Sequence, residues 1–268
     1  MAVDYHLHTY RCGHARGRMA DYVRIARERG LREIGFADHI PIYFHAPEQR
    51  PSGLAMADEE LPEYVAEVLA LRADNPDLPI RLGIEADYIP GREPQLAVLL
   101  ERHPFDYVLG SIHYLDGWGF DNPDFLDGYR GRDADVLYHR YFELLQAAAR
   151  SGLFDSLAHP DLLKKFGCRP RSDITPLYRK TAAVIAAAGI CIEVNTAGLW
   201  APVGEIYPHP IFLRFCCGFG VPVTLGSDAH APERVGSGLP EAIQLLKQAG
   251  YREIATFQRR RRTLIPLE

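Results

Sequence analysis

The sequence predicts an α/β barrel, and three observations support this fold class. Short runs rich in β-branched, aromatic and aliphatic residues alternate along the chain with longer amphipathic runs. Glycines such as Gly30, Gly189 and Gly250 stand where a helix is expected to end. Seven or eight such units within 268 residues favour a closed parallel barrel over an open doubly wound sheet. We therefore expect one barrel domain over residues 1–268.

The individual elements follow from this alternation in chain order. The expected strands lie at 2–7, 33–37, 80–85, 107–112, 156–158, 191–195, 221–225 and 253–257. The expected helices lie at 19–29, 58–73, 93–102, 133–151, 176–188, 210–219 and 240–249.

Two connections are long for a compact domain. Segment 41–57 carries several prolines and glycines, and segment 114–132 is rich in Asp, Gly and aromatic residues. Both follow expected strands, so in a parallel barrel both lie over the rim formed by the carboxyl ends of the strands. Long loops at that rim are typical of a functional site.

Composition excludes several classes of protein. The chain has 30 Lys and Arg against 35 Asp and Glu, a net charge of −5, with 47% hydrophobic and 24% charged residues. These values exclude a disordered chain, a collagen-like fibre and a disulfide knot. The mild acidity argues against a nucleic-acid partner, although a small phosphorylated substrate needs only a few local cations. The arginine run at 259–262 is expected to be solvated or to contact a second copy in a homo-oligomer.

Cysteine usage predicts a reducing, cytoplasmic environment. Five cysteines occur without a CxxC pair, and an odd count does not make a disulfide framework. The start MAVDYHLH lacks the pattern of a signal peptide, and the longest apolar stretch, 181–192, is too short to span a bilayer. We therefore expect a cytoplasmic protein without a membrane partner.

Histidines and carboxylates gather at the ends of the expected strands. Eleven histidines occur, and side chains at the carboxyl ends of barrel strands converge on one rim. The positions at these ends are His6, His8, His14, Asp38, His39, Glu85, His113, His159, Asp228 and His230.

This placement predicts a metal site. Neutral imidazole is the commonest protein ligand of transition metals, and His6 and His8 are two residues apart, so they point to one face of a strand. Glu85 and Asp228 add negative charge, and a glutamate can bridge two ions. A pair of ions about 4 Å apart can clamp the attacking and leaving oxygens of a phosphoryl transfer.

A single HxH or DxH pair is more often a surface or core feature, so the prediction depends on five such clusters recurring at strand ends. Four histidines break the pattern: His103 and His139 are expected to be structural or exposed, and His45 and His209 remain ambiguous. Cys12, between His8 and His14, is a candidate ligand, but a reduced loop thiol is the favoured interpretation.

Nine motifs run in order from residue 4 to residue 230: DYHLHT, CGHARG, FADH, GIEAD, GSIHY, AHPDLLKKFG, EVNTAGL, PVGEIYPHP and GSDAH. With these motifs the sequence resembles the PHP (polymerase and histidinol phosphatase) superfamily, and most closely its histidinol-phosphate phosphatases. The resemblance implies a distorted (β/α)7 barrel, like a TIM barrel, with two or three divalent metal ions: zinc, iron or manganese.

The resemblance also implies a ligand set for each ion. The three sets are His6, His8, Glu85 and Asp228; Glu85, His113 and His159; and His14, His39 and His230. The implied reaction is hydrolysis of L-histidinol phosphate to L-histidinol and phosphate, a step of histidine biosynthesis. In this mechanism Glu85 bridges two ions that supply a hydroxide, and Asp228 or His230 passes a proton to the leaving alkoxide.

Substrate-binding candidates come from the same rim. Arg16, Lys164 and Lys165 are candidate phosphate contacts. The substrate's imidazole and amine need aromatic or acidic neighbours, for which the candidates are Tyr114, Trp118, Phe120 and Asp161. One position departs from the family pattern: Trp200 stands after NTAGL, where a basic residue that reaches the phosphate is expected.

Three alternative functions remain at this stage. One is a related PHP phosphoesterase that acts on phosphotyrosine, a nucleotide or a nucleic-acid 3′ end. Another is a non-catalytic PHP scaffold, which is disfavoured because all nine expected ligand positions hold ligand residues. The third, an amidohydrolase-type barrel, usually needs a lysine at a strand end, where this sequence has none.

Overall fold

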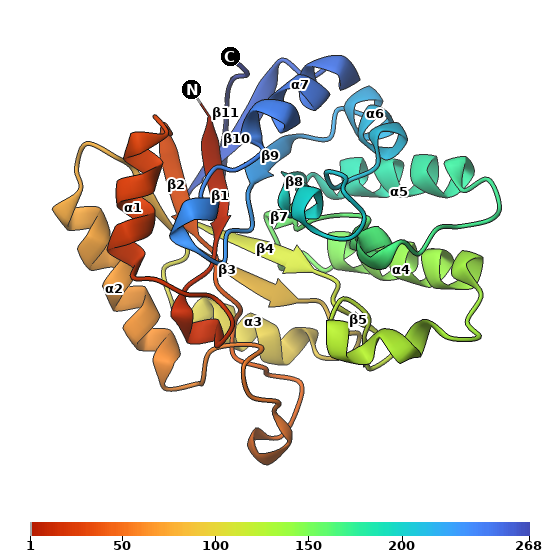
Figure 1. The fold of residues 1–268 in the computed structure, drawn as a ribbon, viewed down its shortest axis with the longest axis horizontal. Helices are drawn as coiled ribbons and strands as arrows, with labels where there is room; N and C mark the ends of the chain where they lie inside the picture. The colour runs from red at the N-terminus through yellow and green to blue at the C-terminus, as the bar shows by residue number, and fades with distance from the viewer. Residues whose placement is uncertain (1) are drawn as a thin grey trace.

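The computed structural model describes residues 2–268, and at its centre lies a parallel sheet of seven strands (Figure 1). Every neighbouring pair is parallel, and the order across the sheet follows the order along the chain. The strands are β1 (Val3–Leu7), β2 (Glu33–Phe36), β3 (Ile80–Asp87), β4 (Tyr107–Ser111), β7 (Ser156–Leu157), β8 (Cys191–Asn195) and β9 (Val223–Gly226).

The first and last strands of this sheet approach each other and nearly close it into a barrel. Leu7 and Ala229 form a parallel bridge just beyond β9. The amide of His8 donates to the carbonyl oxygen of Ala229 at 3.0 Å, and the amide of Ala229 donates to that of His6 at 3.1 Å. The prediction of a distorted (β/α)7 barrel is confirmed.

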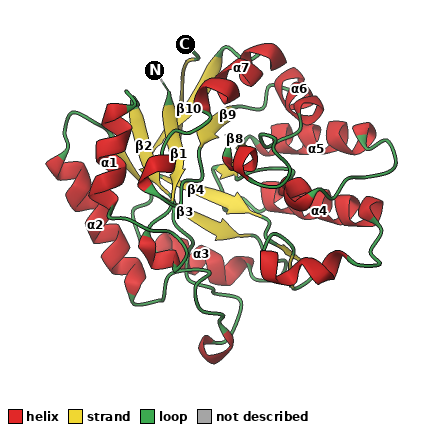
Figure 2. Ribbon diagram, viewed as in Figure 1, coloured by secondary structure: helices red, strands yellow, loops and turns green. Residues whose placement is uncertain are grey.

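Seven α-helices of the described chain surround the sheet (Figure 2). In α1 the residues Met19, Tyr22, Val23 and Ala26 are buried, which is the spacing of an amphipathic helix with one face on a core. All seven predicted helices are confirmed, with small shifts at their ends. They are α1 (Met19–Glu28), α2 (Glu60–Asp74), α3 (Glu93–Glu101), α4 (Ala134–Arg150), α5 (Thr175–Ala188), α6 (Pro210–Gly218) and α7 (Leu239–Ala249).

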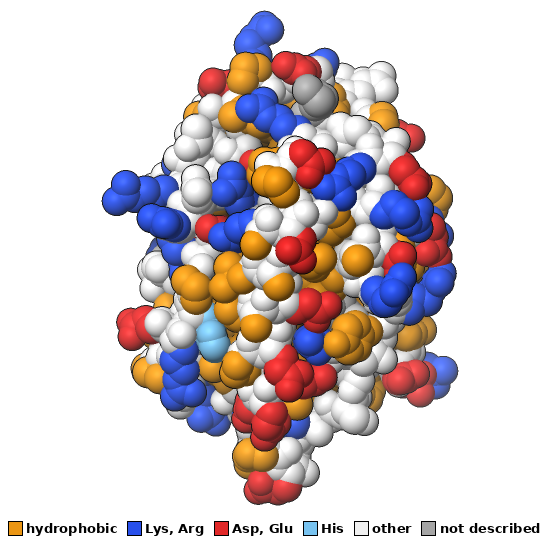
Figure 3. All heavy atoms as spheres, turned by 90° about the vertical axis from the view of Figure 1, so that its left-hand side faces the viewer, with side chains coloured by type: hydrophobic (Ala, Val, Ile, Leu, Met, Phe, Trp, Pro, Cys, Tyr) orange, Lys and Arg blue, Asp and Glu red, His pale blue; other side chains and the backbone are white. Residues whose placement is uncertain are grey.

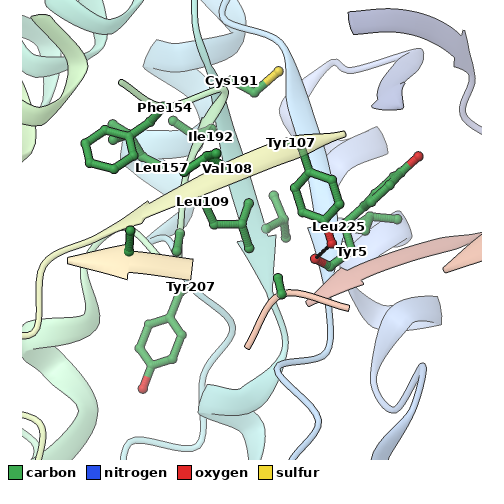
Figure 4. Close-up of a cluster of buried hydrophobic side chains, with 14 of the residues drawn as sticks. Tyr5, Tyr107, Val108, Leu109, Phe154, Leu157, Cys191, Ile192, Tyr207 and Leu225 are labelled. Carbon is green, nitrogen blue, oxygen red and sulfur yellow. Dashed lines mark hydrogen bonds between the residues drawn. The ribbon is translucent and has the colours of Figure 1, made fainter. Parts of the chain in front are cut away.

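A buried tyrosine fills the amino-terminal part of the barrel. The hydroxyl of Tyr107 donates to the carbonyl oxygen of Tyr5 at 2.6 Å (Figure 4), and its ring stacks on Phe257 with 5.7 Å between centroids. Gly35 and Gly83 leave room for this ring, because a Cβ on either would lie 2.2 Å from a Tyr107 side-chain atom. The packed end of the barrel is therefore distinct from the rim that carries the histidines.

The last predicted strand exists, but it does not join the barrel. It is β10 (Glu253–Gln258), and it pairs antiparallel with β11 (Arg261–Pro266), a strand that the sequence analysis missed. Arg259 and Arg260 form the two-residue turn with φ of 50° and 61°. The amide of Arg259 donates to Oδ1 of Asp106 at 3.0 Å. The arginine run thus forms a hairpin turn and the start of a strand.

The long loops contain short elements of their own. Segment 114–132 holds the hairpin of β5 (Tyr114–Leu115) and β6 (Trp118–Gly119), followed by the 3-10 helix η3 (Pro123–Tyr129). Segment 41–57 holds η2 (Pro47–Gln49). The remaining 3-10 helices are η1 (Tyr10–Cys12), η4 (Leu162–Phe166), η5 (Ala197–Trp200) and η6 (Pro232–Arg234).

Acidic and basic side chains are interspersed over the face on the side of α1 and α2 (Figure 3). This face has no continuous basic stripe of the kind that binds nucleic acid. Within residues 2–268, none of the helices has both the length and the apolar character needed to cross a bilayer.

Candidate metal centre

The carboxyl ends of the barrel strands bring all nine expected ligand residues together. Seven imidazoles form one continuous cluster, with neighbouring ring centroids between 3.9 and 5.5 Å apart. Glu85 and Asp228 lie among these rings. The imidazoles belong to His6, His8, His14, His39, His113, His159 and His230.

Glu85, near the end of β3, is the centre of this cluster. Its Oε1 lies 2.8 Å from Nε2 of His159 and 3.5 Å from Nε2 of His113. Its Oε2 lies 3.1 Å from Nδ1 of His39 and 3.3 Å from Nε2 of His6. The two carboxylate oxygens therefore face different imidazoles, which is the arrangement that a bridging carboxylate requires.

Asp228 supplies the second carboxylate of the cluster. Its Oδ1 lies 3.0 Å from Nε2 of His8 and 3.8 Å from Nε2 of His6. Asp228 and His159 both adopt positive φ, 53° and 26°, although neither is a glycine. Such strained backbone persists where the surroundings hold it, and it gathers at functional sites.

Several buried polar atoms here lack a hydrogen-bond partner in the part of the chain that the structure describes. They include Nε2 of His6, Oε2 of Glu85 and Nδ1 of His159, none of which makes a hydrogen bond of regular geometry. Unsatisfied buried groups are costly, and a bound cation resolves them because both imidazole nitrogen and carboxylate oxygen are metal ligands. The ligand atoms of His6, His8 and Asp228 also lie within 4.8 Å of one another. The residues therefore fit divalent metal ions.

A buried glutamate that the sequence analysis missed orients one of the ligands. Oε1 of Glu193 lies 2.8 Å from Nδ1 of His6, and its Oε2 accepts the amide of His159 at 2.8 Å. Gly226 makes room for this carboxylate, because a Cβ there would lie 1.9 Å from Oε1 of Glu193. A charged residue inside the apolar strand β8 was the available signal.

Two aspartates hold further imidazoles in the same way. Oδ1 of Asp38 lies 3.2 Å from Nδ1 of His8, and Oδ1 of Asp87 lies 2.9 Å from Nδ1 of His113. A carboxylate on the far nitrogen fixes the ring and raises its basicity as a metal ligand. Asp87 is two residues beyond Glu85, so it shares a strand face with it.

The cluster is electrostatically suited to cations. Burial alone would raise the pKa of Glu85, but the imidazoles of His39 and His6 outweigh burial and hold this pKa well below its usual range. For Asp228, burial again acts to raise the pKa, and His6 and His8 lower it well below its usual range. Both carboxylates are therefore anionic at neutral pH.

A cavity of about 580 Å³ opens over the cluster. Its wall includes Gly53 from segment 41–57 and Tyr114, Asp121, Asp124 and Phe125 from segment 114–132. The prediction that both long loops cover the strand ends is confirmed. The acidic pair Asp121 and Asp124 was missed, because nothing in the sequence distinguishes these residues from other acidic loop residues.

Residues 4–197 match the PHP domain family. This chain belongs to the PHP family. It is 43% identical over 262 residues to a probable histidinol-phosphatase of Deinococcus radiodurans, covering 96% of this chain and 97% of the relative. It is 25% identical to a histidinol-phosphatase of Lactococcus lactis, over 95% of this chain and 94% of that protein.

Among solved structures, this PHP protein is similar to the crystal structure of a histidinol phosphate phosphatase from Lactococcus lactis in complex with zinc, L-histidinol and phosphate. The TM-score is 0.83 with 22% identity, and the alignment covers 98% of each chain. This likeness supports the shared barrel fold.

The predicted phosphate contacts differ in their positions. Lys165 lines the cavity, and its Nζ donates to the carbonyl oxygen of Asp121 at 2.8 Å and lies 3.3 Å from Oδ2 of the same residue. Arg16 is 72% exposed and forms an ion pair with Glu233, and its side chain is not part of the cavity wall. The structure thus favours Lys165 over Arg16 as the candidate phosphate contact.

Lys164 faces away from the cavity, unlike the sequence expectation. It is fully buried, and its Nζ donates to the carbonyl oxygen of Ile206 at 2.9 Å. The ammonium also lies 3.4 Å from Asp161 and 3.3 Å from Glu205. These contacts tie η4 to the loop before α6, so the side chain anchors the rim instead of facing a substrate.

Of the aromatic and acidic residues expected to contact the substrate, some line the cavity and others do not. Tyr114 lines the cavity, whereas Phe120 is buried in the core, and Trp118 does not belong to the cavity wall. Trp200 is 57% exposed, and the guanidinium of Arg234 lies 4.3 Å from its ring centroid. Asp161 pairs with Lys164, and His209 accepts the amide of Ile211 at the start of α6, so both are structural.

Proposed function

We propose that this PHP protein is a metal-dependent phosphomonoesterase that hydrolyses L-histidinol phosphate to L-histidinol and phosphate in histidine biosynthesis. The observation that carries the proposal is Glu85, whose two oxygens face separate groups of imidazoles beneath a cavity that contains a lysine. The 43% identity to a probable histidinol-phosphatase over nearly the whole chain supports this substrate. A cytoplasmic location is part of the proposal, and it is consistent with the five free cysteines.

The chain offers ligands for two or three divalent ions, zinc, iron or manganese. When bound, such ions activate water and neutralise charge on the phosphoryl oxygens. The proposed sets are His6, His8, Glu85 and Asp228; Glu85, His113 and His159; and His14, His39 and His230. The ligand atoms of His6, His8 and Asp228 lie within 4.8 Å of one another, which supports the first set. Those of His39, Glu85 and His113 are gathered within the same limit, so this group joins a member of the third set to the second.

Protein groups also serve the leaving oxygen. Asp228 and His230 both line the cavity. Because Asp228 is anionic at neutral pH, it passes a proton to the alkoxide only after it has taken that proton from the attacking water, and His230 is the alternative relay. The amide of Asn195 donates to Oδ2 of Asp228 at 3.4 Å, which holds the carboxylate in place. No covalent link between the protein and the phosphoryl group is needed.

The cavity wall matches the three parts of the substrate. The Lys165 ammonium contacts the phosphate, which is a charge-assisted interaction. Asp121 and Asp124 supply the negative charge that the substrate's ammonium group requires. The rings of Tyr114 and Phe125 provide flat apolar surface for its imidazole.

A second candidate is hydrolysis of a different small phosphomonoester, such as phosphotyrosine or a nucleotide. The observation that favours it is Trp200, which stands where the family resemblance leads us to expect a basic residue. Trp cannot form the paired hydrogen bonds that Arg forms with phosphate.

Phosphate release from a panel of monoesters distinguishes the two candidates. We expect the metal-reconstituted protein to hydrolyse histidinol phosphate with a kcat/KM on the order of a hundredfold above that for tyrosine phosphate or a nucleotide. Equal kcat/KM values across the panel would refute histidinol phosphate as the specific substrate but would still support a phosphomonoesterase. No phosphate release from any ester would refute both candidates.

A further inference from the structure

Cys12 lies beside the imidazole cluster, in the short helix η1 that follows β1. Its side chain is fully buried. Its Sγ, a ring nitrogen of His14 and a ring nitrogen of His230 all lie within 4.8 Å of one another. The same limit holds between Sγ and the ligand atoms of His8 and Asp38. A sulfur donor is therefore within reach of two groups of metal-binding atoms.

The two rim imidazoles turn the same nitrogen toward each other. Nδ1 of His14 lies 3.0 Å from the carbonyl oxygen of Gly53, and Nδ1 of His230 lies 3.0 Å from that of Asp228. Carbonyl oxygens only accept, so both Nδ1 atoms carry hydrogen and the neutral rings have their lone pairs on Nε2. These Nε2 atoms are 3.0 Å apart. Two facing lone pairs repel each other unless a proton or a metal ion lies between the two nitrogens.

A buried histidine lies next to the same rings. His8 is fully buried, its Nε2 lies 3.0 Å from Oδ1 of Asp228, and its ring stacks on that of His230 with 3.9 Å between centroids. The rim therefore combines a buried thiol with several nitrogen lone pairs in one small volume. Such a set of S and N donors is typical of a zinc site.

We propose that the Cys12 thiolate is a ligand of the metal ion that His14 and His230 hold. We call the place of this ion the rim position. The thiol now donates to the carbonyl oxygen of Thr9 at 3.2 Å. On binding, its proton leaves to solvent and a sulfur–metal bond forms, with no change of oxidation state. The nine ligands implied by the family resemblance contain only nitrogen and oxygen donors, so the sulfur is an additional ligand.

The thiolate gives the rim position its own metal preference. Sulfur ligands favour zinc, whereas sites of carboxylate and water also suit manganese. This inference rests on the metal centre of the proposed function, but it does not depend on the substrate.

Cobalt substitution tests the proposal, because a thiolate bound to cobalt(II) produces a charge-transfer absorption in the near ultraviolet. We expect this absorption in the cobalt-loaded wild-type protein and in C216S, whose cysteine is equally buried in α6. We expect C12S to lose the absorption and about one cobalt ion per chain, while it keeps the remaining cobalt. An unchanged absorption in C12S would refute the sulfur ligand, and a chain that binds no cobalt would refute the metal centre itself.

X-ray absorption on the zinc-loaded wild-type protein gives a second readout that does not depend on folding of the variant. We expect a sulfur shell at about 2.3 Å beside nitrogen and oxygen at about 2.0–2.1 Å. A zinc spectrum with nitrogen and oxygen alone, at full occupancy of the rim position, would overturn the proposal.

Discussion

Oε1 of Glu193 lies 2.8 Å from Nδ1 of His6, so a buried carboxylate on β8 orients an imidazole on β1. The other oxygen of Glu193 accepts the backbone amide of His159 at 2.8 Å and the side-chain amide of Asn195 at 3.0 Å. One side chain thereby positions two strand ends that are distant in sequence. The proposed metal centre therefore depends on Glu193 as well as on the candidate ligands.

Substitution of Glu193 tests this support. We expect E193Q to bind metal about 10- to 100-fold more weakly, because the amide has one accepting oxygen and its NH2 group cannot accept, so it cannot serve both His6 and the two amides, and it lacks the negative charge beside His6. Metal titration measures the change, and E241Q, at an exposed position of α7, serves as the control. Wild-type metal affinity in E193Q would show that the contact has no role in the site.

Gly226 is expected to be indispensable at the end of β9. A Cβ there would lie 1.9 Å from Oε1 of Glu193 and 2.7 Å from Cβ of His6. We expect G226A to lower the free energy of unfolding by about 1–3 kcal/mol and to weaken metal binding. Denaturant unfolding measures the first effect. The control is G218A, at a helical glycine with open space for a Cβ, and equal stability of the two variants would contradict the crowding argument.

Lys165 is expected to contribute to substrate binding without affecting the metal ions. We expect K165M to lower kcat/KM for histidinol phosphate by about 10- to 100-fold, which corresponds to the loss of one hydrogen bond to a charged group. Steady-state kinetics measures this value, and metal content is expected to stay unchanged. K180M, at an exposed position of α5, is the control. An unchanged kcat/KM would exclude Lys165 as the phosphate contact.

The metal-free protein is expected to lose stability at alkaline pH. Burial acts to lower the pKa of His113, but the carboxylates of Asp87, Asp121 and Glu85 outweigh burial and raise this pKa to about 10. The folded state then holds a proton that the unfolded chain releases near pH 6.5. The contribution of protonated His113 to the free energy of unfolding is therefore complete below about pH 6.5 and is lost as the pH rises toward 10.

Thermal unfolding of the metal-free protein between pH 7 and 10 measures this effect, with D87N as the variant that weakens it. Metal binding is expected to show the opposite trend, because an imidazole must be neutral to bind an ion and affinity then increases with pH. A Tm of the metal-free protein that stays constant over this range would contradict a raised pKa of His113 in the folded state.

The sequence predicts the barrel and the gathering of the candidate ligand residues well, for a physical reason. Strand ends in a parallel barrel converge, so His6, Glu85 and Asp228 are recognisable as neighbours from their places in the β–α alternation alone. The antiparallel pairing of β10 was not recognisable, because β propensity does not report the partner of a strand. The turn at Arg259 and Arg260 also lacks the Asn-Gly or Asp-Gly sequence that usually marks such a hairpin.

The direction of individual side chains in the loops could not be predicted from the sequence. Lys164 and Lys165 are adjacent, and the path of η4 after Asp161, which has a φ of 76°, turns the first into the protein and the second toward the cavity. This conformation depends on contacts with Glu205 and Ile206, which come from a distant part of the chain.

The most direct test of the metal-centre account is the metal content of E85Q, measured together with its phosphatase activity. The substitution preserves size but removes the charge that faces both groups of imidazoles, so we expect bound metal and phosphate release from histidinol phosphate to be lost together. Full metal content with wild-type activity in E85Q would contradict a centre built around Glu85.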